Sequence, residues 1–240
     1  NDVRVFEREC RSLSTLPGIS VVLAGPGLMP PGTSVHHYGL KNRPVGRFQR
    51  FSSAPLRAMH ALRIIDPDII HFHDPELLPV AVMQAKLGKV VIWDAHEDYS
   101  HQFETGVGKP WVPSTLRVPA KSFADGLLRA IDKNAAAVVA ATPVIASRYK
   151  NRRTVVVGNE ARLDDFLACE PSFSARRVLS TGQTSDAHCF RQSVEAVAAL
   201  DGASLSVAGP EPVGGVWNWA QHVLGDRLIY LGWLDRKGMA

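Results

Sequence analysis

The residues best suited to chemistry come at the end of an apolar run in the first third of the chain. Residues 68–72 read Asp-Ile-Ile-His-Phe, and His73 and Asp74 follow directly. Such a run is typical of a short strand that is buried on both faces. Because side chains alternate along a strand, His71 and His73 are predicted to face the same side. Imidazole and carboxylate groups there could move protons, orient a polar substrate or bind a metal ion.

The same arrangement returns about twenty residues later in the chain. Residues 89–93 form a second apolar run, and His96 and Glu97 lie just beyond it. If the two runs are neighbouring parallel strands, their carboxyl ends meet at one edge of the sheet, where ligands bind in open α/β folds. We therefore expect His73 and His96 to lie close together at that edge.

Length and composition predict a globular protein. The chain has 240 residues, of which 45% are hydrophobic and 21% charged, so it can bury a large core. No apolar run approaches the roughly 18 residues of a membrane span. The cysteines Cys10, Cys169 and Cys189 are few and widely spaced, which indicates a reducing compartment and no metal cluster. We therefore expect a cytoplasmic location.

The net charge of +4 hides an asymmetry along the chain. Between Glu9 and Asp66 there is no acidic residue, and the basic residues of that segment are Arg11, Lys41, Arg43, Arg47, Arg50, Arg57 and Arg63. A region of one sign, interleaved with Phe48 and Phe51, favours an anionic partner such as the inner membrane surface. The alternative is an ordinary solvated face. No recognition motif accompanies the charge, so nucleic acid is not expected.

Alternating strand and helix patterns predict two α/β domains. We place the first at residues 1–170 and the second at 171–240, because the alternation restarts after Glu170 and Pro171. The chain opens on a helical pattern, and we expect the first domain to lack its first strand and the second to be incomplete. Residues 102–119 are rich in Gly and Pro and are predicted to be a long irregular loop.

An ordered set of motifs resembles the retaining glycosyltransferases of the GT-B fold, in the family-4 group that includes capsule and exopolysaccharide enzymes. The matching segments are Asn1–Phe6 with Glu9–Arg11, His71–Pro79, Asp94–Asp98, and Thr142–Pro143 before Gly158–Asn159. The resemblance implies two facing Rossmann-like domains. It also implies a UDP- or GDP-linked sugar as donor, a saccharide or lipid-linked acceptor, and neither cofactor nor bound metal.

The resemblance also implies roles for particular residues. His96 would lie near the transferred sugar as the catalytic residue, and the acceptor side would comprise His73, Asp74 and Glu97. The donor would contact Gly182, His188, Arg191 and Gly209. The family usually has a basic residue soon after the glycine of the first strand in the second domain, and residues 182–188 contain His188 but no Lys or Arg. The family's paired glutamates would lie beyond Ala240, so we expect these 240 residues alone to be inactive.

Two other functions fit the same residues. A metal-dependent hydrolase could use the His-x-His pair together with Asp74, Asp94, His96 and Glu97, which supply ligands suited to zinc or manganese. A non-catalytic sugar- or nucleotide-binding module would explain why residues 182–188, where the family binds the donor phosphates, contain no Lys or Arg. The histidines could also be structural, and Asp74 could serve only to cap the following helix.

Overall fold

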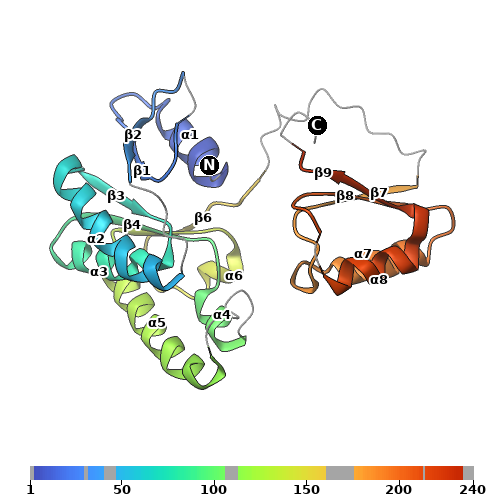
Figure 1. Ribbon diagram of the computed structural model, residues 1–240. Helices are drawn as coiled ribbons and strands as arrows, with labels where there is room; N and C mark the ends of the chain where they lie inside the picture. The colour runs from blue at the N-terminus through green and yellow to red at the C-terminus, as the bar shows by residue number, and fades with distance from the viewer. Residues whose placement is uncertain are drawn as a thin grey trace. The chain divides into compact units, whose positions relative to one another are not determined.

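The computed structural model divides into two compact units, residues 1–159 and 160–240 (Figure 1). The domain boundary predicted at residue 170 lies outside the described part of the chain. The described residues are 3–29, 32–40, 47–105, 113–160, 176–212 and 214–234.

The first unit contains two parallel sheets. Strands β1 (Val22–Gly25) and β2 (His36–Gly39) form one of them. The other has the order β3-β4-β5-β6, with bounds Ile69–Phe72, Val90–Ala95, Ala137–Ala140 and Thr154–Val156. Among the described residues, no strand pairs with both β1 and β3. Every strand pair is parallel, which confirms the predicted α/β class.

Helices connect these strands in chain order. They are η1 (Val3–Cys10), α1 (Arg11–Leu13), α2 (Arg47–Ile65), η2 (Pro75–Leu77), α3 (Leu78–Lys86), α4 (Tyr99–Thr105), α5 (Ser114–Asn134) and α6 (Pro143–Ala146). Helix α6 begins with a Thr142 cap, whose side chain accepts a hydrogen bond from the Ile145 N–H. No helix in the described part of the chain has the length and apolar character needed to cross a bilayer.

The prediction of an irregular loop at residues 102–119 is wrong for most of the described residues in that range, and residues 106–112 lie outside the described part. Helix α4 extends to Thr105, and α5 begins at Ser114, directly after Pro113. Pro119 lies inside α5, whereas Pro normally interrupts a helix interior. Packing against α3 and α4 supports α5 here, and tertiary packing commonly outweighs local propensity.

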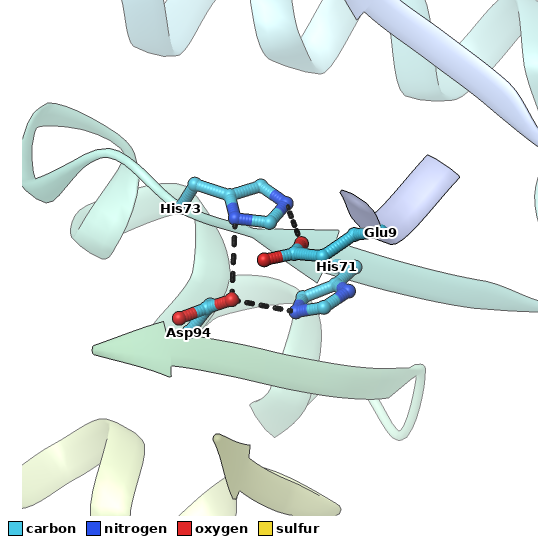
Figure 2. Close-up of side chains that lie close together, drawn as sticks. All are labelled: Glu9, His71, His73 and Asp94. Carbon is cyan, nitrogen blue, oxygen red and sulfur yellow. Dashed lines mark ion pairs between the residues drawn. The ribbon is translucent and has the colours of Figure 1, made fainter. Parts of the chain in front are cut away.

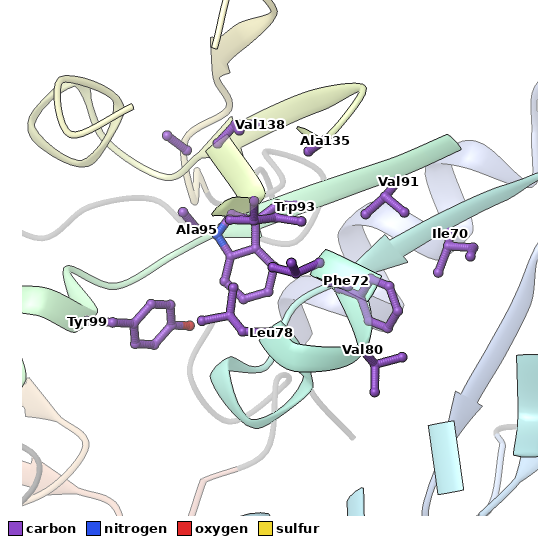
Figure 3. Packing of buried hydrophobic residues seen from close by; sticks show 14 of the residues in the cluster. Ile70, Phe72, Leu78, Val80, Val91, Trp93, Ala95, Tyr99, Ala135 and Val138 are labelled. Atoms are coloured by element: carbon purple, nitrogen blue, oxygen red, sulfur yellow. The ribbon is translucent and has the colours of Figure 1, made fainter. Parts of the chain in front are cut away.

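The core of the first unit is built around Trp93, which is fully buried on β4 (Figure 3). Its neighbours in the cluster include Phe72 of β3, Leu78 of α3 and Tyr99 of α4. The indole N–H donates a hydrogen bond of 3.1 Å to the Tyr149 hydroxyl, which satisfies its polar atom.

Burial alternates along β3, so the prediction that this strand is buried on both faces is wrong. On β3, Ile70 and Phe72 are buried, whereas Ile69 is exposed and His71 is only partly buried. Alternation sends the aliphatic and aromatic side chains into the core and the histidines to the opposite face. The sheet therefore has one face that is free to carry polar groups.

The second unit is a three-stranded parallel sheet of order β7-β8-β9, with bounds Arg177–Thr181, Ser204–Ala208 and Leu228–Gly232. Its helices are η4 (Asp186–His188), α7 (Phe190–Ala198), α8 (Gly215–Leu224) and η5 (Gly225–Arg227). Helices α7 and α8 pack side by side along the sheet (Figure 1). Phe190, Val194, Leu205 and Val207 form the centre of this second core.

Candidate functional site

The candidate site surrounds Asp94, whose side chain on β4 is completely buried. Two histidines of the neighbouring strand end approach its Oδ2 atom: His71 Nε2 lies 3.6 Å away and His73 Nδ1 lies 3.5 Å away (Figure 2). His96 Nδ1 lies 3.2 Å from Oδ1 and forms a hydrogen bond with it. One buried carboxylate thus contacts three imidazoles at the carboxyl edge of the sheet.

The N-terminal helix η1 supplies the remaining charged groups. Arg4 donates from Nη2 to Asp94 Oδ1 at 3.0 Å, and its Nε lies 3.1 Å from Glu9 Oε1. The other carboxylate oxygen of Glu9 lies 3.6 Å from His73 Nε2. Residues that are far apart in the sequence therefore meet in one cluster.

The geometry of η1 explains how Arg4 and Glu9 reach the same point. Residues 3–10 form a π-helix, in which backbone hydrogen bonds join residues five apart. Arg4 and Glu9 have this spacing, so they share one side of the helix. In an α-helix of 3.6 residues per turn they would point in different directions. Rare π-helical segments occur often at functional sites.

Burial and mutual contact shift the pKa values of the cluster in different directions. Burial opposes ionisation of Asp94, but the close approach of the His71, His73 and His96 rings outweighs it and holds the pKa of Asp94 well below the usual range. Burial, followed by the negative charge of Asp94, raises the pKa of Glu9 to about 8. At neutral pH the cluster therefore contains an ionised Asp94 beside a protonated Glu9.

The imidazoles of this cluster also differ from one another. Burial lowers the pKa of His73, and the nearby Asp94 offsets this only in part. Burial also disfavours protonation of His96, but the hydrogen bond and charge of Asp94 more than compensate, so the pKa of His96 is raised. The two rings stack with centroids 5.9 Å apart. His96 is thus the more readily protonated of the two.

The protonated state of Glu9 predicts a pH-dependent stability. Its pKa rises from 4.5 to about 8 on folding, so the unfolded chain releases this proton first as pH increases. Stability relative to the Glu9→Gln variant is therefore expected to fall between about pH 4.5 and pH 8, by at most about 1.4 kcal/mol per unit for one proton. Urea unfolding at several pH values measures the difference.

Glu7→Gln is the matched control, because the Glu7 carboxylate contacts Arg11 at the surface of the same helical segment. This variant is expected to follow the wild-type pH profile. A wild-type stability that runs parallel to that of Glu9→Gln over the whole range would show that Glu9 is ionised in the folded protein.

The structure brings some of the predicted site residues together and separates others. His73 and His96 lie side by side, as the strand pattern predicted. Asp74 is exposed and close enough for its charge to raise the pKa of His96. Sequence analysis missed Arg4 and Glu9 as site residues, although both lie in a motif of the family resemblance. The π-helical geometry of η1 places the side chains of both residues next to the sheet edge.

Glu97 faces a different environment from the cluster around Asp94. Its side chain is exposed and accepts a hydrogen bond of 2.7 Å from Gln102. It lines a pocket of about 210 Å³ whose walls include Asp125, Arg129 and Arg148. None of the residues that contact Asp94 lines this pocket. The acceptor role of Glu97 stays a prediction.

The glycines predicted to bind the donor lie together in the second unit. Gly182 follows β7 and Gly209 follows β8, and the Gly182 N–H donates to the Ala208 carbonyl at 2.8 Å. A Cβ atom built on Gly209 would collide with the Gly182 carbonyl. The two strand ends approach so closely that position 209 accepts only glycine.

His188 and Arg191 were predicted to contact the donor. His188 ends η4, just before α7, and Arg191 lies in the first turn of α7. His188 Nδ1 is 2.7 Å from the Ser185 hydroxyl, and Arg191 Nε is 3.4 Å from Asp186 Oδ1. The Arg191 guanidinium also lies 4.4 Å from the ring centroid of Trp219, in a cation–π contact. A phosphate that binds Arg191 would therefore compete with Asp186.

The close contact at Gly209 predicts a large effect of a single added methyl group. Gly209→Ala is expected to destabilise the second unit by about 2–3 kcal/mol, because a backbone carbonyl cannot rotate out of the way as a side chain can. Gly215→Ala is the control, since a Cβ there meets nothing within 4 Å, and it should be neutral or slightly stabilising. Hydrogen exchange of the β7–β9 amides measures both. Equal protection in the two variants would contradict the prediction.

The cluster also contains side chains that can bind a metal ion. Glu9, His71, His73 and Asp94 each offer one ligand atom, and these atoms lie within 4.8 Å of one another. Imidazole and carboxylate ligands suit zinc and manganese. However, the Arg4 guanidinium already contacts both carboxylates, and its fixed positive charge opposes a divalent cation at the same point.

Comparison with solved structures identifies the fold. A sucrose-phosphate synthase from Thermosynechococcus elongatus has a TM-score of 0.68 at 16% identity and matches 99% of this chain and 66% of its own. A glycosyltransferase from Rickettsia africae has a TM-score of 0.53 at 14% identity, over 91% of this chain and 61% of its own. The chain thus spans less than two thirds of the length of these two structures.

A third structure, titled MnaA–UDP from S. aureus, has a TM-score of 0.52 at 11% identity and matches 92% of this chain and 70% of its own. No curated protein sequence matches the chain. These similarities confirm the predicted GT-B-like fold with Rossmann-like parallel sheets. The family model described as Glycosyltransferase Family 4 matches residues 3–159. The chain is therefore a member of glycosyltransferase family 4.

Proposed function

We propose that this protein transfers a sugar from a UDP- or GDP-linked donor to a saccharide or lipid-linked acceptor, with retention at the anomeric carbon. The observation that carries the proposal is the match to family 4 over residues 3–159, the region that holds the whole Asp94 cluster. One of the similar structures is a co-structure of MnaA with UDP, which supports a nucleotide-linked donor. We expect the reaction to serve polysaccharide biosynthesis.

The first unit would act on the sugar and the acceptor. In retaining transfer, the bond between the anomeric carbon and the donor diphosphate breaks, the acceptor oxygen bonds to the same face of the sugar, and the proton of the acceptor hydroxyl passes to the departing diphosphate. His96 would hydrogen-bond the sugar and stabilise charge that develops as the diphosphate leaves. Its neighbours His73 and Asp74 would orient the acceptor hydroxyl.

The second unit would bind the nucleotide diphosphate. Gly182 and Gly209 bring bare backbone to the ends of β7 and β8, where a phosphate or ribose can approach closely. His188 and Arg191 would supply side-chain donors next to them at the start of α7. Phosphate binding there would release Arg191 from Asp186.

Isotope-labelled UDP- and GDP-sugars with lipid-linked acceptors test this function. We expect turnover by a version extended beyond Ala240 and none by the 240 residues alone, because the family's paired glutamates would lie beyond that point. Product analysis should show a retained anomeric configuration. An inverted product would exclude retention, and equal rates for the two versions would place the donor site elsewhere. Donor binding without turnover by the extended version would favour the non-catalytic module.

A metal-dependent hydrolase is the second candidate, favoured by the convergence of four ligand atoms within 4.8 Å. The two functions differ in their metal requirement. Elemental analysis of protein purified without chelator, followed by calorimetric titration with Zn²⁺ and Mn²⁺, separates them. Stoichiometric metal that is lost in Glu9→Gln would support the hydrolase, whereas metal-free protein with transferase activity would exclude it.

We also propose that the acid-free segment binds the inner face of an anionic membrane. Residues 41–46 and the side chain of Phe48 lie outside the described residues, but Phe51 on α2 is 39% exposed and Leu56 is 73% exposed. Basic residues near an anionic surface contribute roughly 1 kcal/mol each, an attraction that salt screens. The protein would then act as a cytoplasmic, peripherally bound enzyme.

Vesicle sedimentation tests the membrane proposal. Binding is expected with vesicles that contain anionic lipid and should weaken as salt increases. Phe51→Ala should reduce it, whereas Phe123→Ala, at a 67% exposed position on α5, is the matched control. Binding that is equal for neutral and anionic vesicles would overturn the proposal.

A further inference from the structure

The carboxylate of Asp94 is completely buried, whereas the side chain of its neighbour His96 is partly exposed. The Asp94 side chain contacts Arg4 from η1, His71 and His73 from β3, and His96. An isolated buried charge is very unfavourable unless it is paired and hydrogen-bonded. The charge of Asp94 is paired in this way by residues from three segments: η1, the end of β3, and the residues that follow β4.

The contact with His96 differs from the other histidine contacts. His96 Nδ1 meets Asp94 Oδ1 at hydrogen-bond distance, 3.2 Å, whereas His71 and His73 lie at 3.6 Å and 3.5 Å. An acceptor on Nδ1 determines which ring nitrogen carries the proton of a neutral imidazole. It also fixes the orientation of the ring, and leaves Nε2 as the nitrogen that is not engaged by Asp94.

Arg4 and Glu9 hold Asp94 in turn. The Arg4 Nη2 atom lies 3.0 Å and 3.3 Å from the two carboxylate oxygens, while Nε contacts Glu9. The π-helical form of η1 places both residues on this side. Supporting residues of this kind commonly determine the rotamer and protonation of the group that meets the substrate.

We propose that Asp94, anchored by Arg4, is a positioning residue that holds His96 at its Nδ1 atom and fixes the orientation of the ring. This role rests on the proposed function, in which His96 contacts the transferred sugar. The titratable or charged groups that face His96 are Asp94 on β4, Arg4 and Glu9 on η1, and His73 and Asp74 at the end of β3. Asp94 favours the protonated ring, and Arg4 opposes it.

Histidine NMR titration of the 240-residue chain tests the proposal without any need for turnover. D94N removes the negative charge and is expected to lower the pKa of His96. R4Q removes the positive charge and is expected to raise it. General loss of structure would move the His96 pKa of both variants toward the value of a solvated histidine. Shifts of opposite sign in the two variants therefore indicate contacts specific to Asp94 and Arg4.

Asp98→Asn is the matched control, because Asp98 lies two residues beyond His96 and pairs with Arg148 rather than with the cluster. It should leave the titration of His96 unchanged. A His96 pKa that is unaffected by D94N overturns the proposal. If D94N does not fold, R4Q decides the question, since an unchanged or lowered His96 pKa in that variant also overturns it.

The extended enzyme provides the kinetic readout. D94N is expected to lower kcat at least tenfold with little change in KM. In the pH profile of kcat, the change that reports the titration of His96 should shift in the same direction as the His96 pKa measured by NMR. A shifted NMR titration without any transferase activity in the wild type would reject the proposed function and leave the positioning role intact. A normal pH profile in an active D94N enzyme would overturn the positioning role alone.

Discussion

His96→Ala is expected to reduce sugar transfer by a factor that corresponds to about 2–4 kcal/mol of transition-state stabilisation. The imidazole lies at the carboxyl edge of the sheet, is held by Asp94 at 3.2 Å, and has a raised pKa. A group held in this way offers a preorganised donor where charge develops on the reacting sugar and diphosphate. Alanine removes that donor and leaves the sheet intact.

The measurement is kcat/KM of the extended enzyme, with the fold checked by circular dichroism and amide NMR. His101→Ala is the control, because His101 is an exposed histidine on the neighbouring helix α4 and should tolerate the change. A His96→Ala enzyme that keeps its activity within a few-fold would exclude His96 from the mechanism.

Trp93→Ala is expected to destabilise the first unit by about 3–5 kcal/mol, the usual cost of removing a buried aromatic side chain. Trp93 is completely buried and packs between Phe72, Leu78 and Tyr99. Its loss leaves a cavity and also removes the donor to the Tyr149 hydroxyl. Because Asp94 follows it on the same strand, the site should loosen together with the core.

Urea unfolding followed by hydrogen exchange of the β3–β6 amides measures this loss. Trp93→Phe should cost less, since it keeps most of the apolar volume and gives up mainly the hydrogen bond. Trp233→Ala is the control, because Trp233 is 76% exposed, and it should change stability by no more than about 0.5 kcal/mol. Comparable losses in Trp93→Ala and Trp233→Ala would show that the core does not depend on Trp93.

The sequence alone was enough to determine those features that depend on local pattern and on general rules of α/β sheets. The runs around His71 and Trp93 predicted parallel strands. The proximity of His73 and His96 followed because neighbouring parallel strands end at the same edge. The motifs along residues 3–159 carried the family.

Only the tertiary structure decided which groups complete the site. Arg4 and Asp94 are ninety positions apart, and no local pattern indicates that a π-helix brings Arg4 and Glu9 to the end of β4. The same contacts decide charge: Glu9 becomes protonated because it is buried beside Asp94, an effect that requires three-dimensional proximity. Glu97, adjacent to His96 in sequence, faces Gln102 and a separate pocket instead. Sequence identifies chemically capable residues, but packing determines which of them share one low-dielectric environment.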